Sequence, residues 1–115
     1  MKEIAKEFKA IFDQFYQAPI EVWENFVGYG EVVEKQKNEI LKRHNERALD
    51  FYFVLEGSGG ILLFSNNNYI CIDLCYEGDF LVDYMSFLTY QPTELEVVCF
   101  EKCRLFRISR KNFIE

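Results

Sequence analysis

Four cysteines form the largest set of residues that could carry chemistry. They are Cys71, Cys75, Cys99 and Cys103, two pairs with three residues between the members of each pair. Four thiolates can hold zinc or an iron–sulfur cluster, but such sites usually place their cysteines closer together on loops. Here both members of the first pair lie in an apolar, strand-like run, and free cysteine packs like a small hydrophobic residue. Core packing is therefore the favoured interpretation, ahead of metal binding and redox sensing.

A single histidine, His44, limits the catalytic chemistry that the chain could support. Metal-dependent oxygenases and isomerases built on β-barrels need several histidines and a carboxylate around the metal. A Ser-His-Asp or Cys-His set would have to use the same histidine, which lies in the polar loop 43–47 and is expected to be exposed. We therefore expect no catalytic residue, no metal site, no cofactor and no enzymatic activity.

A third set of candidates lies in residues 83–85 and 93–94. Asp83 could pair with a ligand hydroxyl or a cation, although capping the following short segment is the favoured role. Tyr84 and Met85 could close over an apolar ligand, and packing of a helix on the mouth of a barrel is the favoured alternative. Thr93 and Glu94 could line a pocket, but they are more typical of the start of a strand.

Composition places these residues in one small domain. The chain has 115 residues, of which half are hydrophobic and 17% are aromatic, too apolar for a disordered segment. No apolar run is long enough to span a membrane, and the N-terminus does not begin a signal peptide, so we expect a cytoplasmic domain. The net charge of −6 opposes nucleic-acid binding, and the locally basic segment 102–111 is interpreted as a solvated face.

Two helices are predicted in the N-terminal part, residues 1–30. In the first, apolar residues recur at spacings that place them on one helical face. These residues are Ile4, Phe8, Ile11, Phe12 and Phe15. Pro19 suits the first turn of a second helix, which runs through Val27. Gly28 and Gly30 are expected to end it.

From residue 31 to residue 108 the pattern changes to short alternating runs separated by turn residues. Strands are predicted near 31–35, 40–43, 51–55, 60–64, 69–76, 80–81, 94–99 and 103–108. Segment 83–88 lacks this alternation and predicts a short helix inserted between strands. Asparagines in 65–68 predict a hairpin turn. The predicted fold is mainly β with flanking helices, a double-stranded β-helix or jelly roll.

One domain is predicted to span residues 1–115, with a helix starting after Ser109, which can cap it. Residues 109–115 give only about one helical turn, which is marginal alone because the cost of nucleation is not recovered. We therefore expect this helix to be truncated at Glu115.

The order of these elements resembles the cyclic-nucleotide-binding domain of catabolite-activator and FNR-like (Crp/Fnr) transcription regulators. Residues 51–58 are similar to the family's central strand and turn, and 78–80 to its Gly-Asp/Glu-Phe turn. Residues 103–110 resemble its last strand and the start of its long dimerisation helix. Residues 37–41 look like its tight turn, with Asn38 where glycine usually lies. The resemblance covers nearly the whole chain and implies the cyclic-nucleotide-binding-domain fold.

In this family the inserted segment resembles a phosphate-binding cassette, with a small residue, a glutamate for the ribose hydroxyl and an arginine for the cyclic phosphate. This chain has Val82 in place of the small residue, Asp83 in place of the glutamate and Thr93 in place of the arginine, followed by Glu94. Loss of the charge-assisted bond costs about 1.5–3 kcal/mol, and a nearby carboxylate repels phosphate further. The resemblance thus implies these effector-pocket candidates: Val82, Asp83, Tyr84, Met85, Thr93 and Glu94.

The resemblance implies an effector-sensing regulatory domain that responds to an unknown small molecule and is not expected to bind cyclic AMP. A ligand-free β-roll interaction module and a surviving cyclic-nucleotide sensor are the alternatives. DNA binding would require a C-terminal domain that this chain lacks, and the parent protein is expected to be a homodimer without membrane contact. A closed apolar pocket beside Tyr84 and Met85 would favour the sensor, whereas aromatic side chains filling that space would favour the module.

Overall fold

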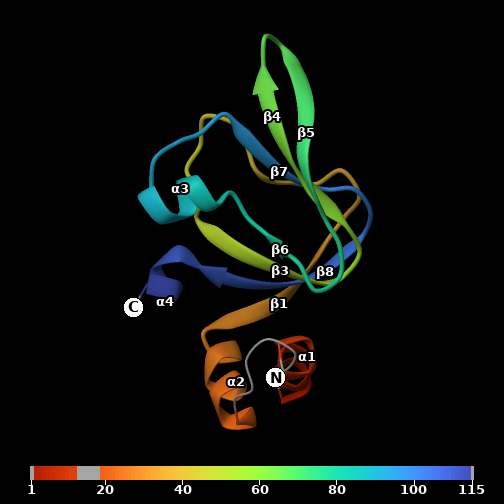
Figure 1. The fold of residues 1–115 in the computed structure, drawn as a ribbon, viewed down its shortest axis with the longest axis vertical. Coiled ribbons are helices and arrows are strands. Elements are labelled where there is room, and N and C mark those ends of the chain that lie inside the picture. Colours follow the sequence, from red (N-terminus) through yellow and green to blue (C-terminus); the bar gives the residue numbers. More distant parts are fainter. Residues whose placement is uncertain (1, 13–18, 115) are drawn as a thin grey trace. The chain divides into compact units, whose positions relative to one another are not determined.

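The computed structural model describes residues 2–12 and 19–114, which divide into two compact units (Figure 1). The first unit extends to Glu31 and the second begins at Val32. No helix among the described residues is long and apolar enough to cross a membrane. The second unit contains the candidate site, so the fold is described mainly there.

The first unit holds two helices that contact each other, α1 (Lys2–Phe12) and α2 (Ile20–Val27). Both predicted helices are confirmed, although Phe15 of the predicted apolar face lies outside the described residues. Gly28 ends α2, and its N–H bonds to carbonyls of the last helical turn. Gly30 was predicted to help end this helix, but it instead begins the first strand.

The second unit is built from eight strands with one helix inserted before the last two. The strands are β1 (Gly30–Lys35), β2 (Ile40–Lys42), β3 (Asp50–Glu56), β4 (Gly59–Ser65), β5 (Asn68–Cys75), β6 (Phe80–Leu81), β7 (Leu95–Cys99) and β8 (Cys103–Ser109). The inserted helix is α3 (Tyr84–Thr89), and α4 (Arg110–Ile114) follows β8. Each predicted strand and the inserted helix are confirmed, with ends that differ by at most one residue.

The strands form two four-stranded sheets, in the orders β1-β8-β3-β6 and β2-β7-β4-β5. The pairs of β3 with β6 and β8, of β7 with β2 and β4, and of β4 with β5 are antiparallel, with Phe53 opposite Phe106 in the first sheet and Ile61 opposite Val97 in the second. In Figure 1 the β4–β5 hairpin extends beyond the other strands, and β5 is an edge strand of its sheet. The predicted mainly β roll is therefore confirmed.

The core lies between the two sheets and takes side chains from both. Its buried residues are Tyr52, Val54, Ile61, Cys75, Leu81, Val97, Cys99, Cys103 and Leu105. Core packing is thus confirmed for three of the four cysteines, while Cys71 is exposed on β5 and its predicted burial is wrong. Burial raises the pKa of both Cys75 and Cys99 to about 12, so these thiols stay protonated at neutral pH.

Asparagines supply the left-handed backbone at the tight turns. Asn66 and Asn67, with φ of 54° and 59°, form the hairpin turn between β4 and β5 that the sequence predicts. Asn38 also has a positive φ, 67°, at the turn where the family usually carries glycine. Asparagine is one of the few residues with a side chain that tolerates this conformation, so these turns fix the strand register.

Position 60 on β4 requires glycine because the ring of Phe100 lies too close for a side chain. A Cβ at this position would lie 2.5 Å from the ring of Phe100, far inside van der Waals contact. The ring therefore covers the strand where the side chain is missing. This contact joins β4 to the turn between β7 and β8.

Candidate functional site

Asp83 lies between β6 and α3, and its side chain is fully buried. One carboxylate oxygen accepts a hydrogen bond from the backbone N–H of Ser86 at 3.1 Å, which confirms the predicted helix cap. The other oxygen, Oδ2, lies 3.1 Å from Nζ of Lys42 and accepts a hydrogen bond from the hydroxyl of Thr93. Both oxygens of Asp83 are thus used within the chain.

Lys42 on β2 supplies the cation of this site, which sequence reasoning missed. The residue is only 6% exposed. Its ammonium donates to the Thr93 hydroxyl at 2.9 Å and to the Leu95 carbonyl at 2.7 Å, and it pairs with Asp83. Each of its three N–H groups therefore has a nearby acceptor, so the buried charge is both paired and hydrogen-bonded.

A register shift explains how a lysine reaches the interior. Ile40 lies opposite Val98, but Lys42 lies opposite Val97, so two residues on β2 advance the pairing by only one on β7. Such a bulge changes the face that the following side chain occupies. Val97 belongs to the core, and its partner Lys42 is turned inward beside it. Simple alternation along β2 gives no sign of this.

The structure brings together only part of the predicted site. Val82 is buried next to Asp83, and Thr93 bonds to Asp83 from the segment before β7. Met85 is 65% exposed and Glu94 is also exposed, so neither contributes to the buried cluster. Tyr84 is half exposed at the start of α3.

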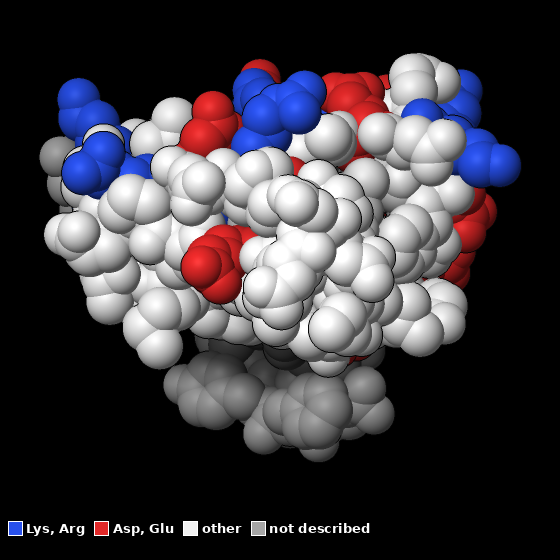
Figure 2. Space-filling model, turned by 90° about the horizontal axis from the view of Figure 1, so that it is seen from above, with Lys and Arg blue, Asp and Glu red and all other residues white. Residues whose placement is uncertain are grey.

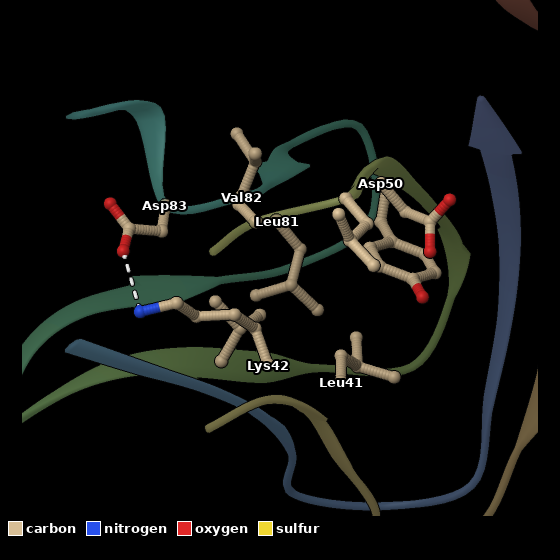
Figure 3. A pocket seen from close by; sticks show the side chains of 10 residues that line it. Leu41, Lys42, Asp50, Leu81, Val82 and Asp83 are labelled. Carbon is tan, nitrogen blue, oxygen red and sulfur yellow. Dashed lines mark ion pairs between the residues drawn. The ribbon is translucent and has the colours of Figure 1, made fainter. Parts of the chain in front are cut away.

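A cavity beside the ion pair is too small for a nucleotide (Figure 3). Its volume is about 10 Å³, near the space that one water molecule needs. Figure 3 shows Lys42 and Asp83 pointing toward each other, with Leu41, Leu81 and Val82 nearby. Pockets for drug-sized ligands usually measure about 300–1,000 Å³. The described residues therefore close this part of the roll.

The far side of the cavity carries a second carboxylate. Asp50 lines it together with Tyr52, and the two side chains share a hydrogen bond. Burial raises the pKa of Asp50 above its ordinary value, against the opposing effects of Lys35 and Tyr52. A second acidic group would make this cavity still less favourable for an anion.

Aromatic side chains fill the space beneath α3. The ring of Phe51 lies 4.8 Å from Phe80, 5.5 Å from Phe87 and 6.4 Å from Tyr84, measured between centroids. On its other side, Tyr84 borders a groove of about 270 Å³ that is lined by residues of β5 and the segment 78–80. In the described part of the chain, Tyr84 thus borders packed rings and this groove.

His44 belongs to a separate polar cluster on the outer side of the second sheet. Its ring stacks on Phe64 with centroids 4.1 Å apart, and its Nδ1 pairs with Glu96. The Tyr69 hydroxyl also donates to Glu96, at 3.3 Å. Burial raises the pKa of Glu96, but hydrogen bonds from His44 and Tyr69 outweigh it and leave the pKa below its usual value. His44 was predicted to be an exposed loop residue, but these contacts leave its side chain only 30% exposed.

The chain thus forms a β-roll of two four-stranded sheets, with a helix inserted between β6 and β7 and a compact polar site at the start of that helix. A family model described as the cyclic nucleotide-binding domain matches residues 32–115. The chain therefore belongs to the cyclic nucleotide-binding domain family. Such domains are usually regulatory modules without catalytic activity.

Solved structures of similar fold include both transcription regulators and kinase subunits. The sensor domain of the transcriptional regulator DNR from Pseudomonas aeruginosa has a TM-score of 0.78 at 15% identity, covering 98% of this chain and 76% of that chain. The Thermus thermophilus catabolite activator protein has a TM-score of 0.76 at 17% identity, covering 90% of this chain and 47% of that one.

A third similar structure is the regulatory subunit of a cAMP-independent protein kinase A from Trypanosoma brucei, solved as a triple variant bound to cAMP. It has a TM-score of 0.81 at 18% identity, covering 97% of this chain and 41% of that chain. The chain thus spans less than half of the kinase subunit and of the catabolite activator. At these identities the similarity shows the fold alone. No curated protein sequence matches this chain.

Proposed function

We propose that this domain is the effector-sensing domain of a Crp/Fnr-type transcription regulator, and that it does not bind cyclic AMP in the family's pocket. The observation that carries the proposal is the closed cluster of Lys42, Asp83 and Thr93. Its cation and its carboxylate satisfy each other, with side chains 6% and 0% exposed. A cyclic phosphate entering here would have to displace Asp83 from Lys42.

The energetics of the cluster oppose such an exchange. A phosphodiester in a half-buried pocket needs a cation whose N–H groups are available to it. The ammonium of Lys42 already has three acceptors, and breaking a buried pair leaves an uncompensated charge. Val82 is buried next to the pair, and the cavity is about 10 Å³. Each of these features supports a pocket that excludes cyclic nucleotides.

The regulator assignment is supported by the fold and by the position of α4. The sensor domain of one transcriptional regulator and a catabolite activator share this fold. Helix α4 begins directly after β8, where the resemblance places the start of a dimerisation helix. In the proposed regulator, two such chains form a homodimer in the cytoplasm, and a further domain contacts DNA. The isolated domain should give no sequence-specific shift of operator DNA in a gel.

One protein of similar fold is itself described as independent of cyclic AMP. The regulatory subunit from Trypanosoma brucei is described as cAMP-independent, and its cAMP-bound form carries three substitutions, one of them threonine to arginine. In this chain, Thr93 lies where the resemblance expects an arginine. This correspondence supports the proposal that the effector is not cyclic AMP.

The second candidate is a ligand-free interaction module. The packed rings of Phe51, Phe80 and Phe87 beneath α3 favour it, because they occupy space that an apolar ligand would need. In that case the domain acts through its surface rather than through a pocket.

The test is a thermal unfolding experiment with cyclic AMP and cyclic GMP at millimolar concentration. A ligand at about 100 times its Kd stabilises by about 2.7 kcal/mol, which raises the midpoint of a domain of this size by several degrees. We expect no rise for this domain, while a catabolite activator protein in the same assay shows one. A reproducible rise with either nucleotide would overturn the proposal.

A further inference from the structure

Two arginines converge on one exposed tyrosine at the C-terminal end of α3. Tyr90 caps this helix with φ of 59°, its N–H bonds to the Ser86 carbonyl at 2.7 Å, and it is 43% exposed. The guanidinium carbon of Arg110 lies 4.5 Å from the centroid of the Tyr90 ring, and that of Arg47 lies 5.2 Å from it. One ring thus contacts two cations from distant parts of the sequence.

A hydrogen bond from Nε fixes each guanidinium. Nε of Arg47 donates to the Tyr90 carbonyl at 2.8 Å, and Nε of Arg110 donates to the Phe87 carbonyl at 2.7 Å. Together with the stacking on the ring, these bonds hold the planar groups before any ligand arrives. The terminal Nη groups keep four further N–H donors on each arginine.

The charges of the two arginines are not balanced by acidic side chains. Within residues 2–12 and 19–114, neither Arg47 nor Arg110 has a carboxylate oxygen within 4.0 Å. Carbonyls at the end of α3 compensate them in part, but this helix has only six residues. Two like charges beside one ring repel each other, although the chain as a whole carries −6. A bound anion would remove this repulsion.

A third basic residue follows the pair in the sequence. In Figure 2, lysine and arginine side chains lie at the left, the side on which α3 and α4 lie in Figure 1, and also at the upper centre and right. Lys111 follows Arg110 in the first turn of α4 and is exposed. Arg47, Arg110 and Lys111 therefore supply positive charge at this end of the molecule, in a chain whose net charge is −6.

We propose that Arg47 and Arg110 bind the phosphate group of a small phosphorylated ligand beside Tyr90. Guanidinium groups suit this ligand because their paired N–H donors match two phosphate oxygens at once. The site lies at the opposite end of α3 from Asp83, so it is separate from the closed family pocket. The proposal rests on the proposed sensing function and gives the effector a chemical class.

The position of this site also indicates how binding would affect the rest of the domain. Arg110 is the first residue of α4, Arg47 lies in the loop before β3, and Tyr90 ends α3. A phosphate held by both arginines would link α4 to the roll. Binding would therefore stabilise one placement of α4, the helix that continues toward the dimer interface in the proposed regulator.

The test uses nuclear magnetic resonance of the arginine Nε–Hε groups in the whole chain. Inorganic phosphate and phenyl phosphate are titrated separately, with chloride keeping the ionic strength constant. We expect the Nε–Hε signals of Arg47 and Arg110 to shift together with a single Kd. Tighter binding of phenyl phosphate would indicate a phosphate ester, and equal or tighter binding of inorganic phosphate would indicate the free anion.

Variants separate a specific site from general effects of the anion. Arg47→Gln and Arg110→Gln should each weaken binding about tenfold, the loss of one charge-assisted contact. Lys102→Gln removes an exposed charge in the turn between β7 and β8 and should leave the Kd unchanged. Side-chain shifts are used instead of melting temperatures, because phosphate stabilises most proteins by exclusion from their surface.

Three results would overturn the proposal. The first is no shift of either signal up to 50 mM phosphate, and the second is a shift of only one arginine signal. The third is that Lys102→Gln weakens phosphate binding as much as the two arginine substitutions do. Arg47 lies in an exposed loop, so its variant remains informative if Arg110→Gln disturbs folding. The proposed exclusion of cyclic AMP is tested at Lys42 and Asp83, and phosphate titration does not involve that cluster. Failure of one proposal is thus distinguishable from failure of the other.

Discussion

Replacing Lys42 with methionine should strongly destabilise the domain. Methionine keeps most of the length of the side chain but removes the charge, leaving the fully buried carboxylate of Asp83 without its cation. Removing one member of a buried ion pair usually costs about 3–5 kcal/mol. Asp83 keeps hydrogen bonds from the Ser86 N–H and the Thr93 hydroxyl, so we expect the lower end, about 3 kcal/mol.

Urea unfolding at pH 7 measures this loss directly. With a slope of about 1.5 kcal/mol per molar urea, the midpoint should fall by about 2 M with little change in slope. Lys35→Met is the matched control, since it breaks a pair with Glu39 that is 22% and 39% exposed, and it should cost less than about 1 kcal/mol. The comparison separates the stability lost by breaking a buried pair from the stability lost by removing any lysine.

A double-mutant cycle tests whether the cost arises from the pair itself. Asp83→Asn keeps the shape of the carboxylate, and the double variant with Lys42→Met leaves no uncompensated charge. We expect the double variant to be more stable than the sum of the two single losses predicts, by about 2 kcal/mol. A loss below 1 kcal/mol for Lys42→Met, or additive losses in the cycle, would refute the stabilising coupling between Lys42 and Asp83.

Three further predictions concern other parts of the roll. The pKa of Glu96 is below its usual value of 4.5, so its contribution to stability is present above that pH and is lost as the pH falls through the lower, folded-state pKa. Urea unfolding between pH 3 and 7 should show this loss in the wild type but not in Glu96→Gln. Gly60→Ala should cost about 1–3 kcal/mol by thermal unfolding, because its methyl group meets the Phe100 ring, and Phe100→Leu should partly restore stability; no rescue would argue against this contact. Cys71 alone should react quickly with a disulfide reagent under native conditions, and a second fast thiol would contradict the buried placement of the others.

Much of the fold could be predicted because its signals are local. Alternating apolar residues predict the strands, and the asparagines at 66 and 67 predict the hairpin turn. The cap at Asp83 follows from residue type and position alone. The prediction for Cys71 is wrong because strand β5 lies at the edge of its sheet and its pairing with β4 shifts register between Ile61 and Leu62.

The chemistry of the site was harder to predict, because its partners come from distant segments. Lys42 and Asp83 are brought together only by the bulge in β2, which alternation does not show. Arg47 and Tyr90 meet through the packing of a loop against the end of α3. Sequence reasoning therefore identified the acidic half of the cluster and missed its cation.

The Lys42–Asp83 pair also limits the order in which substitutions could bring this chain to the arginine-containing pattern that the resemblance expects. An arginine at position 93, introduced alone, would place a second cation beside Lys42 and remove the Thr93 hydroxyl that both charged groups use. Loss of Lys42 alone would leave Asp83 unpaired. Each of these two single changes thus passes through a less stable protein, whereas making both changes together leaves Asp83 with a cation. The effects of substitutions at these three positions are therefore non-additive, and the outcome of a change at one position depends on the residues at the other two.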